Sequence, residues 1–152
     1  SVTALTFAAA GRLVHSGVKP STIFAALYEQ NTLARLHLQG RILSATRTEL
    51  GGRLIYSTAT PRDLAETGAE ATDTEDVVNR LLGVAGVEVA LLFLELGPEE
   101  TKVSLRSRTG FDVRKVAEPF GGGGHAAASG VRYPGPLAAA VEALTAAVRK
   151  VL

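Results

Sequence analysis

The ten residues from Gly121 to Gly130 constrain the fold of this chain more than any other stretch. Four glycines open it, and they permit backbone conformations with positive φ and let a ligand reach main-chain N–H groups. His125 follows, with a ring that can donate to a phosphate oxygen and carry charge near neutral pH. A flexible linker is the alternative interpretation, but apolar Phe120 and the strand-like Val131-Arg132-Tyr133 border the run, where polar residues are more typical. The stretch therefore predicts an anion-binding loop, closed by a short helix or turn of small residues that packs tightly against a sheet.

Length and composition indicate a globular chain with a real core. The chain has 152 residues, of which 46% are hydrophobic and 20% charged. A net charge of +1 gives no global field for nucleic acid, so any anion site must be local. The absence of cysteine excludes disulfides and thiol chemistry, and no apolar run is long enough to span a bilayer. We expect a cytoplasmic location, and the initial Ser1 suggests a fragment of a longer protein.

The first part of the chain predicts helices with no sheet between them. Helical spacing of apolar residues indicates one helix over 3–14, a second from Pro20 to about Gln30 and a third from about Thr32 into the forties. The second helix is expected to bury Ile23, Phe24 and Leu27. We expect residues 1–45 to form a helical lead-in.

The remaining residues, 46–152, predict an α/β fold: a small mixed β-sheet flanked by helices, preceded by the helical lead-in. Gly51-Gly52 indicates a hairpin, and Thr60-Pro61 is typical of a helix start. The apolar run over 87–94 predicts a central strand, and alternation over 101–107 predicts an amphipathic one. Further elements are expected as a helix from Thr72 or Asp73, a helix from Asp112 to Ala117, a strand from Val131 and a helix from Pro136 to Val151.

Two arginines at the end of the amphipathic strand are candidates to complete the anion site. Arg106 and Arg108 flank Ser107, and alternation places both arginines on one face, with Ser107 opposite unless the strand ends or bulges there. A guanidinium offers a rigid fork of donors that matches two phosphate oxygens. From the residues alone, solvated strand ends are the more common interpretation of both arginines.

The residues do not supply a metal centre. His15, His37 and His125 are far apart in the sequence, and none has a carboxylate neighbour at ligand-like spacing. Glu99-Glu100 and the acidic group over 72–76 are interpreted as structural or solvated. Two-metal hydrolysis needs several converging carboxylates, so we expect neither metal ligands nor catalytic residues in this chain.

The glycine stretch resembles a known family signature. Gly122-Gly123-Gly124-His125, two variable residues and Ala128-Ser129-Gly130 are similar to the GGGH-x-x-[AS]-[AS]-G motif of the DHH-associated domain, the substrate-binding domain of the DHH phosphoesterase superfamily. Within it the chain looks most like the NrnA-like nanoRNase and pAp-phosphatase branch, through Leu27-Tyr28-Glu29, 73–79, 86–90 and 102–107. Ser129 and Ala126-Ala127 differ from the residues that many relatives have there, which removes possible polar contacts to the substrate.

The resemblance implies a division of labour between two domains. Residues 1–45 would be a lead-in or linker from a catalytic domain outside this chain, and residues 46–152 the DHH-associated substrate-binding domain. The parent protein would be a manganese-dependent phosphoesterase that hydrolyses short oligoribonucleotides and 3′-phosphoadenosine 5′-phosphate, with Mn²⁺ held in that other domain and this chain inactive alone. Substrate contacts are expected from Arg106, Ser107, Arg108, Gly122, Gly123, Gly124 and His125. His125 is the candidate to polarise the phosphoryl group.

Other partners and activities stay open at this point. Short RNA or a nucleotide bisphosphate is the expected substrate, and a second copy of the chain is a further candidate partner. A cyclic-dinucleotide phosphodiesterase or a RecJ-type exonuclease would share the glycine motif. A non-catalytic RNA-binding module is the third alternative, and the near-neutral charge argues against it because strong RNA binding needs many phosphate contacts.

Overall fold

A computed structural model describes residues 2–108 and 110–152 of the chain. These residues form two compact units, one ending at Thr32 and one running from Leu33 to Leu152. The sequence places the division at residue 45 instead. The difference arises from α3 (Leu33–Ser44), which buries Leu38, Gln39 and Ile42 in the second unit.

The first unit consists of α1 (Ala4–His15) and α2 (Pro20–Tyr28). Thr3 caps α1, since its Oγ1 accepts a hydrogen bond from the Thr6 N–H at 3.3 Å. Neither helix buries any residue, so the expected burial of Ile23, Phe24 and Leu27 is wrong; these side chains are 44%, 53% and 67% exposed. Two short helices alone cannot enclose a core.

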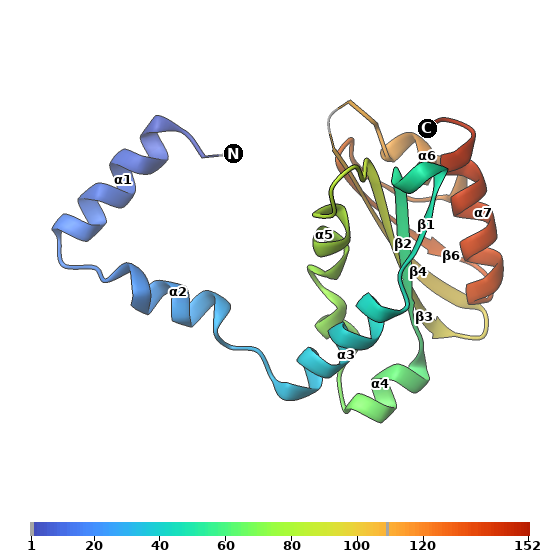
Figure 1. Cartoon of the computed structure of the whole chain (residues 1–152), viewed down its shortest axis with the longest axis horizontal. Helices are drawn as coiled ribbons and strands as arrows, with labels where there is room; N and C mark the ends of the chain where they lie inside the picture. Colours follow the sequence, from blue (N-terminus) through green and yellow to red (C-terminus); the bar gives the residue numbers. More distant parts are fainter. Residues whose placement is uncertain (1, 109) are drawn as a thin grey trace. The chain divides into compact units, whose positions relative to one another are not determined.

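The second unit is built on a mixed sheet with strand order β1-β2-β3-β4-β6-β5, which confirms the predicted α/β fold (Figure 1). β2 and β3 are parallel, and the other neighbouring pairs are antiparallel. The connection from β2 to β3 carries α4 (Pro61–Thr67), a 3₁₀ turn (Ala71–Thr74) and α5 (Val77–Leu82). The strands are β1 (Arg47–Glu49), β2 (Leu54–Ala59), β3 (Val89–Gly97), β4 (Glu100–Ser107), β5 (Gly123–His125) and β6 (Ala128–Tyr133).

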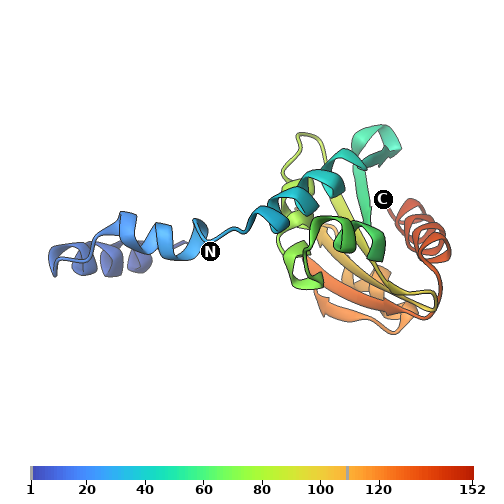
Figure 2. The ribbon, with the colours of Figure 1, turned by 90° about the horizontal axis from the view of Figure 1, so that it is seen from below.

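Helices cover both faces of the sheet, and each face has its own hydrophobic core. α3 and α5 pack on one face, while α6 (Arg114–Ala117) and α7 (Leu137–Arg149) pack on the other (Figures 1 and 2). β3 contributes to both cores, because Val89, Leu91 and Phe93 point to the α7 side and Ala90, Leu92 and Leu94 to the α5 side. This confirms the prediction of a central strand that is apolar on both faces.

Two local predictions are also confirmed. Residues 50–52 form a tight turn between β1 and β2, with Gly51 at φ 68°. Thr60 and Asp63 form a capping box at the start of α4: Thr60 Oγ1 accepts from the Asp63 N–H at 3.2 Å, and Asp63 Oδ2 accepts from the Thr60 N–H at 2.9 Å.

Other element boundaries differ from the prediction. The helix expected at Thr72 or Asp73 begins at Val77, because the chain first makes a 3₁₀ turn and Asp76 then adopts φ 66°. The strand expected from Val131 begins at Ala128. The glycine stretch forms β5 and the start of β6, and Gly123 pairs with Gly130 across this hairpin. Of the expected short helix or turn, the structure has the turn, at Ala126 and Ala127 between the two strands.

Candidate anion-binding site

The sheet brings Arg106 and His125 to one face. Along β4, Val103 and Leu105 are buried toward α7, and alternation turns Arg106 to the α5 side. The strand register pairs Arg106 with Ala128, and Ala128 with His125. Residues in register on neighbouring strands share a face, so Arg106 and His125 lie on the same face with Ala128 between them, about 10 Å apart at Cα. The small methyl group of Ala128 leaves room between the Arg106 guanidinium and the His125 imidazole.

This face is open where it carries the candidate residues. His125 and Gly123 on the edge strand β5 are exposed, and Arg106 is half-buried. α6 packs against β5 and β6 from the opposite face, where Val113 and Val116 join the α7-side core. The hairpin is therefore supported from behind and accessible from the front.

The Arg106 guanidinium has N–H donors that make no hydrogen bond with the residues that the structure describes. Its Nη1 donates to the Leu105 carbonyl at 2.9 Å, and it makes no ion pair with another residue in the part of the chain that the structure describes. Arg106 borders a hollow of about 420 Å³, the Arg106 hollow, whose other lining residues are Thr74, Glu75, Asp76, Val78, Lys102, Ser104 and Ser129. A half-buried guanidinium with unused donors is suited to binding an anion.

The structure separates Ser107 from Arg106. Ser107 is 7% exposed and points to the α7 side, where its Oγ contacts the carbonyl oxygens of Phe111 at 2.6 Å and Ala126 at 3.2 Å. It therefore ties the loop after β4 to the hairpin from behind the candidate site. Arg108 follows the end of β4 and is exposed; its N–H donates to the Glu88 carbonyl at 2.9 Å.

The fold itself requires three of the four consecutive glycines. A Cβ on Gly122 would lie 2.3 Å from the Gly130 carbonyl oxygen, and one on Gly124 would lie 2.5 Å from that of Ala128. Gly121 and Gly124 also have positive φ, at 72° and 140°. Gly123 is different, because a Cβ there would meet nothing within 4 Å.

Sequence reasoning missed three residues that border the Arg106 hollow. Lys102 shares its face with Arg106 and borders the same hollow, and the alternation along β4 already carried that signal. Glu75 and Asp76, interpreted from sequence as structural or solvated, also border the hollow. No local pattern signalled this, because the turn over 71–76 reaches β4 only through the tertiary fold.

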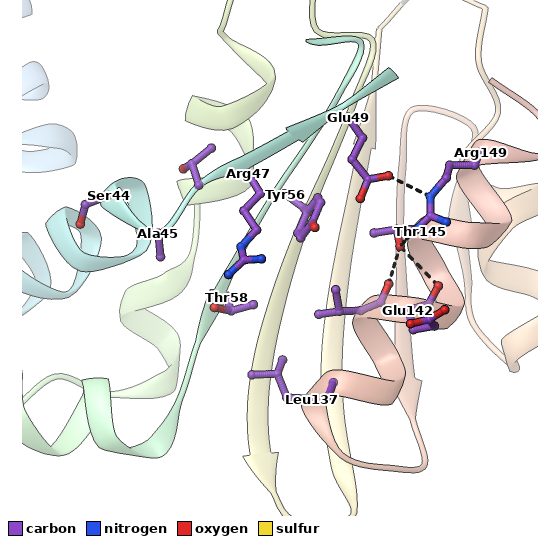
Figure 3. A pocket seen from close by; sticks show the side chains of 13 residues that line it. Ser44, Ala45, Arg47, Glu49, Tyr56, Thr58, Leu137, Glu142, Thr145 and Arg149 are labelled. Atoms are coloured by element: carbon purple, nitrogen blue, oxygen red, sulfur yellow. Dashed lines mark hydrogen bonds and ion pairs between the residues drawn. The ribbon is translucent and has the colours of Figure 1, made fainter. Parts of the chain in front are cut away.

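A second cleft of about 670 Å³ lies between β1, β2 and α7 and contains none of the predicted residues (Figure 3). Its polar groups bond to one another: Arg149 Nε donates to Glu49 Oε2 at 2.8 Å, and Arg149 Nη2 donates to Thr145 Oγ1 at 2.9 Å. Burial raises the pKa of Tyr56, and the adjacent Glu49 carboxylate raises it further. This cleft is on the α7 side of the sheet, away from Arg106 and His125.

Metal ligands do not converge in the described part of the chain. Within residues 2–108 and 110–152, no three or more His, Cys, Asp or Glu side chains are grouped so that they could hold a metal ion. Over the same residues, no helix combines the length and the apolar character needed to cross a membrane.

Together, the fold and the site define a small α/β domain whose open sheet face carries cations beside a bare glycine hairpin. Residues 51–152 match the DHHA1 domain, and the chain belongs to this family as an NrnA-like DHH-associated domain. It is 35% identical over 116 residues to the bifunctional oligoribonuclease and PAP phosphatase NrnA of Thermus thermophilus, covering 76% of this chain and 34% of that protein. The protein of the same name from Mycoplasma genitalium is 32% identical over 99 residues, covering 65% of this chain and 30% of that protein. The chain thus spans about a third of the length of these curated relatives.

Solved structures share the fold. An exopolyphosphatase-related protein from Bacteroides fragilis aligns with a TM-score of 0.90 at 26% identity, covering 97% of this chain and 44% of that one. The pGpG-specific phosphodiesterase PggH from Vibrio cholerae aligns with a TM-score of 0.58 at 15% identity, covering 97% of this chain and 52% of that one. The second likeness shows the fold alone.

Proposed function

We propose that this chain is the substrate-binding part of a phosphoesterase that hydrolyses short oligoribonucleotides and 3′-phosphoadenosine 5′-phosphate. The observation that carries the proposal is the alignment of Arg106 and His125 on one open sheet face, with only Ala128 between them. The names of the two curated relatives support this choice of substrates.

A phosphate group fits between the two side chains. The Arg106 guanidinium offers parallel donors, and His125 approaches from the other side of Ala128. Each charge-assisted hydrogen bond of this kind contributes roughly 1.5–3 kcal/mol.

Manganese and the hydrolytic step belong, in this proposal, to a domain outside the chain. The chain spans about a third of its curated relatives, and its own described residues do not fit a metal centre. The role proposed for this part is to bind and orient the phosphate, with Arg106 and His125 as the residues that hold it. A cytoplasmic location is part of the same proposal.

Calorimetric titration with 3′-phosphoadenosine 5′-phosphate tests the binding role. Arg106→Ala and His125→Ala are each expected to weaken binding about tenfold, the equivalent of roughly 1.4 kcal/mol. Lys150→Ala is the matched control, because it removes an exposed cation after α7, on the other side of the sheet. Equal affinities for all three variants, or no binding by the wild type at millimolar ligand, would overturn the proposal.

Further assays on the same chain distinguish the alternative functions. With Mn²⁺ and 3′-phosphoadenosine 5′-phosphate added, we expect no release of inorganic phosphate, and measurable turnover would contradict the assignment of catalysis to another domain. Preference for a cyclic dinucleotide would favour the phosphodiesterase alternative. Affinity for long RNA that falls steeply with salt would favour an RNA-binding module.

A further inference from the structure

Two glycines on the open sheet face, Gly123 and Gly130, stand at positions where the fold would accept a side chain. We call this pair the Gly123–Gly130 floor. Gly123 and Gly130 pair across the β5–β6 hairpin, and Gly130 also pairs with Ser104 on β4. A Cβ on Gly123 would meet nothing within 4 Å, and a Cβ on Gly130 would meet only the Val103 carbonyl oxygen, at 3.6 Å. Both positions would therefore accept a side chain sterically. Glycine at such positions is typical of sites where a ligand approaches the backbone closely.

A second hollow lies over this floor. It has a volume of about 340 Å³, and we call it the Gly123 hollow; its lining residues are Lys102, Val103, Ser104, Gly121, Gly122, Gly123, Gly130, Val131 and Arg132. Lys102 and Ser104 also line the Arg106 hollow. The two hollows therefore adjoin along β4, with Ser104 between Arg106 and Lys102.

Lys102 is the available cation of the Gly123 hollow. Its side chain is exposed and makes no ion pair or hydrogen bond with the residues that the structure describes. Arg132 pairs in register with Lys102, but its guanidinium is bound to the Glu100 carboxylate. The hydroxyl of Ser104 is half-buried at the junction and can donate to an oxygen above the glycine floor.

We propose that Lys102 and the Gly123–Gly130 floor hold a further phosphate of a bound oligonucleotide, more than one phosphate step along the strand from the phosphate held by Arg106 and His125. The four residue steps from Arg106 to Lys102 span about 13 Å along β4. This span is longer than the step between neighbouring phosphates of one strand, so the two phosphates of 3′-phosphoadenosine 5′-phosphate, which share one ribose, do not reach from Arg106 to Lys102. A cation at this distance suits a longer strand, as in grooves that follow a single-stranded backbone. Lys102 then sets a preference for oligonucleotides over a single nucleotide. This inference rests on the proposed function of the Arg106 site.

Two ligands of different length test the proposal on the whole chain. We would titrate 3′-phosphoadenosine 5′-phosphate and a 5′-phosphorylated triadenylate, following affinity by calorimetry and the amide signals of Gly123 and Gly130 by NMR. Lys102→Ala is expected to weaken trinucleotide binding about tenfold, while 3′-phosphoadenosine 5′-phosphate binding stays within about twofold. The slope of log affinity against log salt for the trinucleotide should fall by about 0.7, as one phosphate contact is lost.

Matched variants make the result specific. Lys102→Arg keeps the charge and should retain most of the trinucleotide affinity. Gly123→Ala adds a methyl group to the floor, and should weaken the trinucleotide selectively while the protein stays folded. Lys150→Ala should leave the affinity for both ligands unchanged.

Failure of this inference is distinguishable from failure of the proposed function. If Arg106→Ala weakens both ligands but Lys102→Ala weakens neither, or both equally, the second phosphate position is overturned and the Arg106 site stands. Trinucleotide binding that leaves the Gly123 and Gly130 amides unshifted has the same meaning. If Arg106→Ala changes the affinity for neither ligand, or if the wild type binds neither ligand, the proposed function fails and this inference fails with it.

Discussion

Adjacent residues in β4 serve opposite sides of the sheet. Arg106 borders the open hollow, whereas Ser107 is buried beneath it and bonds to two carbonyl oxygens. Strand geometry enforces this, because successive side chains point to opposite faces. A motif that names both residues together therefore combines a candidate ligand contact with a structural one.

Replacing the Ser107 hydroxyl is expected to affect stability rather than binding. Ser107→Ala leaves the Phe111 and Ala126 carbonyls without this partner, and should lower the free energy of unfolding by about 1 kcal/mol. Urea denaturation measures this effect, and calorimetry should find 3′-phosphoadenosine 5′-phosphate affinity within about twofold of the wild type. An unchanged stability with a binding loss equal to that of Arg106→Ala would show that Ser107 contacts the ligand instead.

At the scale of elements, the glycine hairpin is shaped by two separate demands. Gly122 and Gly124 allow β5 to lie close against β6, where any side chain would collide with the backbone of the neighbouring strand. Gly123 and Gly130 leave the front of the hairpin bare. The repeated glycines thus do not share one role.

Alanine substitutions at two of the hairpin glycines should differ in how much stability they cost. Gly122→Ala forces a collision with the Gly130 carbonyl and is expected to cost about 1–3 kcal/mol. Gly123→Ala meets open space, and should stay within about 0.5 kcal/mol of the wild type. Urea denaturation of both variants gives the comparison, and equal losses would contradict the packing described for β5.

The start of α4 provides a pH-dependent element. Burial by itself raises the pKa of Asp63, but hydrogen bonds from Thr60 and the pairing with Arg41 outweigh it, so the pKa lies below the ordinary 3.8. A carboxylate with a lowered folded-state pKa stabilises the fold fully above its unfolded-state pKa, and that stabilisation is lost as pH falls through the folded-state pKa.

Asp63→Asn is therefore expected to be less stable than the wild type by about 1 kcal/mol at pH 6. The gap should narrow as the pH falls below about 4, since the wild-type carboxylate becomes protonated. Urea denaturation at pH 6 and pH 3 checks this. A gap that is constant with pH would mean that the charge of Asp63 contributes nothing to the cap.

At the scale of the whole molecule, the two units differ in how much they bury. Every residue of the core lies in the second unit, from Leu38 onward. The first unit instead exposes large apolar side chains: Val2, Leu5, Phe7, Leu13, Val14, Ile23, Phe24, Leu27 and Tyr28. Exposed apolar surface of this extent favours association of the chain in water.

Removal of residues 1–32 should therefore leave the fold of the second unit intact. Residues 33–152 are expected to unfold cooperatively with a Tm within about 4 °C of the full chain, equivalent to less than about 1 kcal/mol. In sedimentation velocity experiments, the full chain should associate more strongly than the shorter one. A shorter chain that fails to fold would show that the first unit supports the core.

The sequence by itself determined the features whose physical cause is local. The turn at Gly51, the Thr60–Asp63 cap, the alternation along β4 and the doubly apolar β3 follow from backbone freedom, capping chemistry and side-chain period. The glycine motif likewise identified the family, because its residue types and spacing are specific.

Only the tertiary structure decided which of these features meet. Strand register placed His125 beside Arg106 across Ala128, and added Lys102 and the bare Gly123–Gly130 floor to the same face. Packing also drew α3 into the second unit and brought the acidic turn at Asp76 to the edge of the hollow. Register and packing depend on contacts between residues far apart in the chain, and a local pattern carries no record of its distant partner.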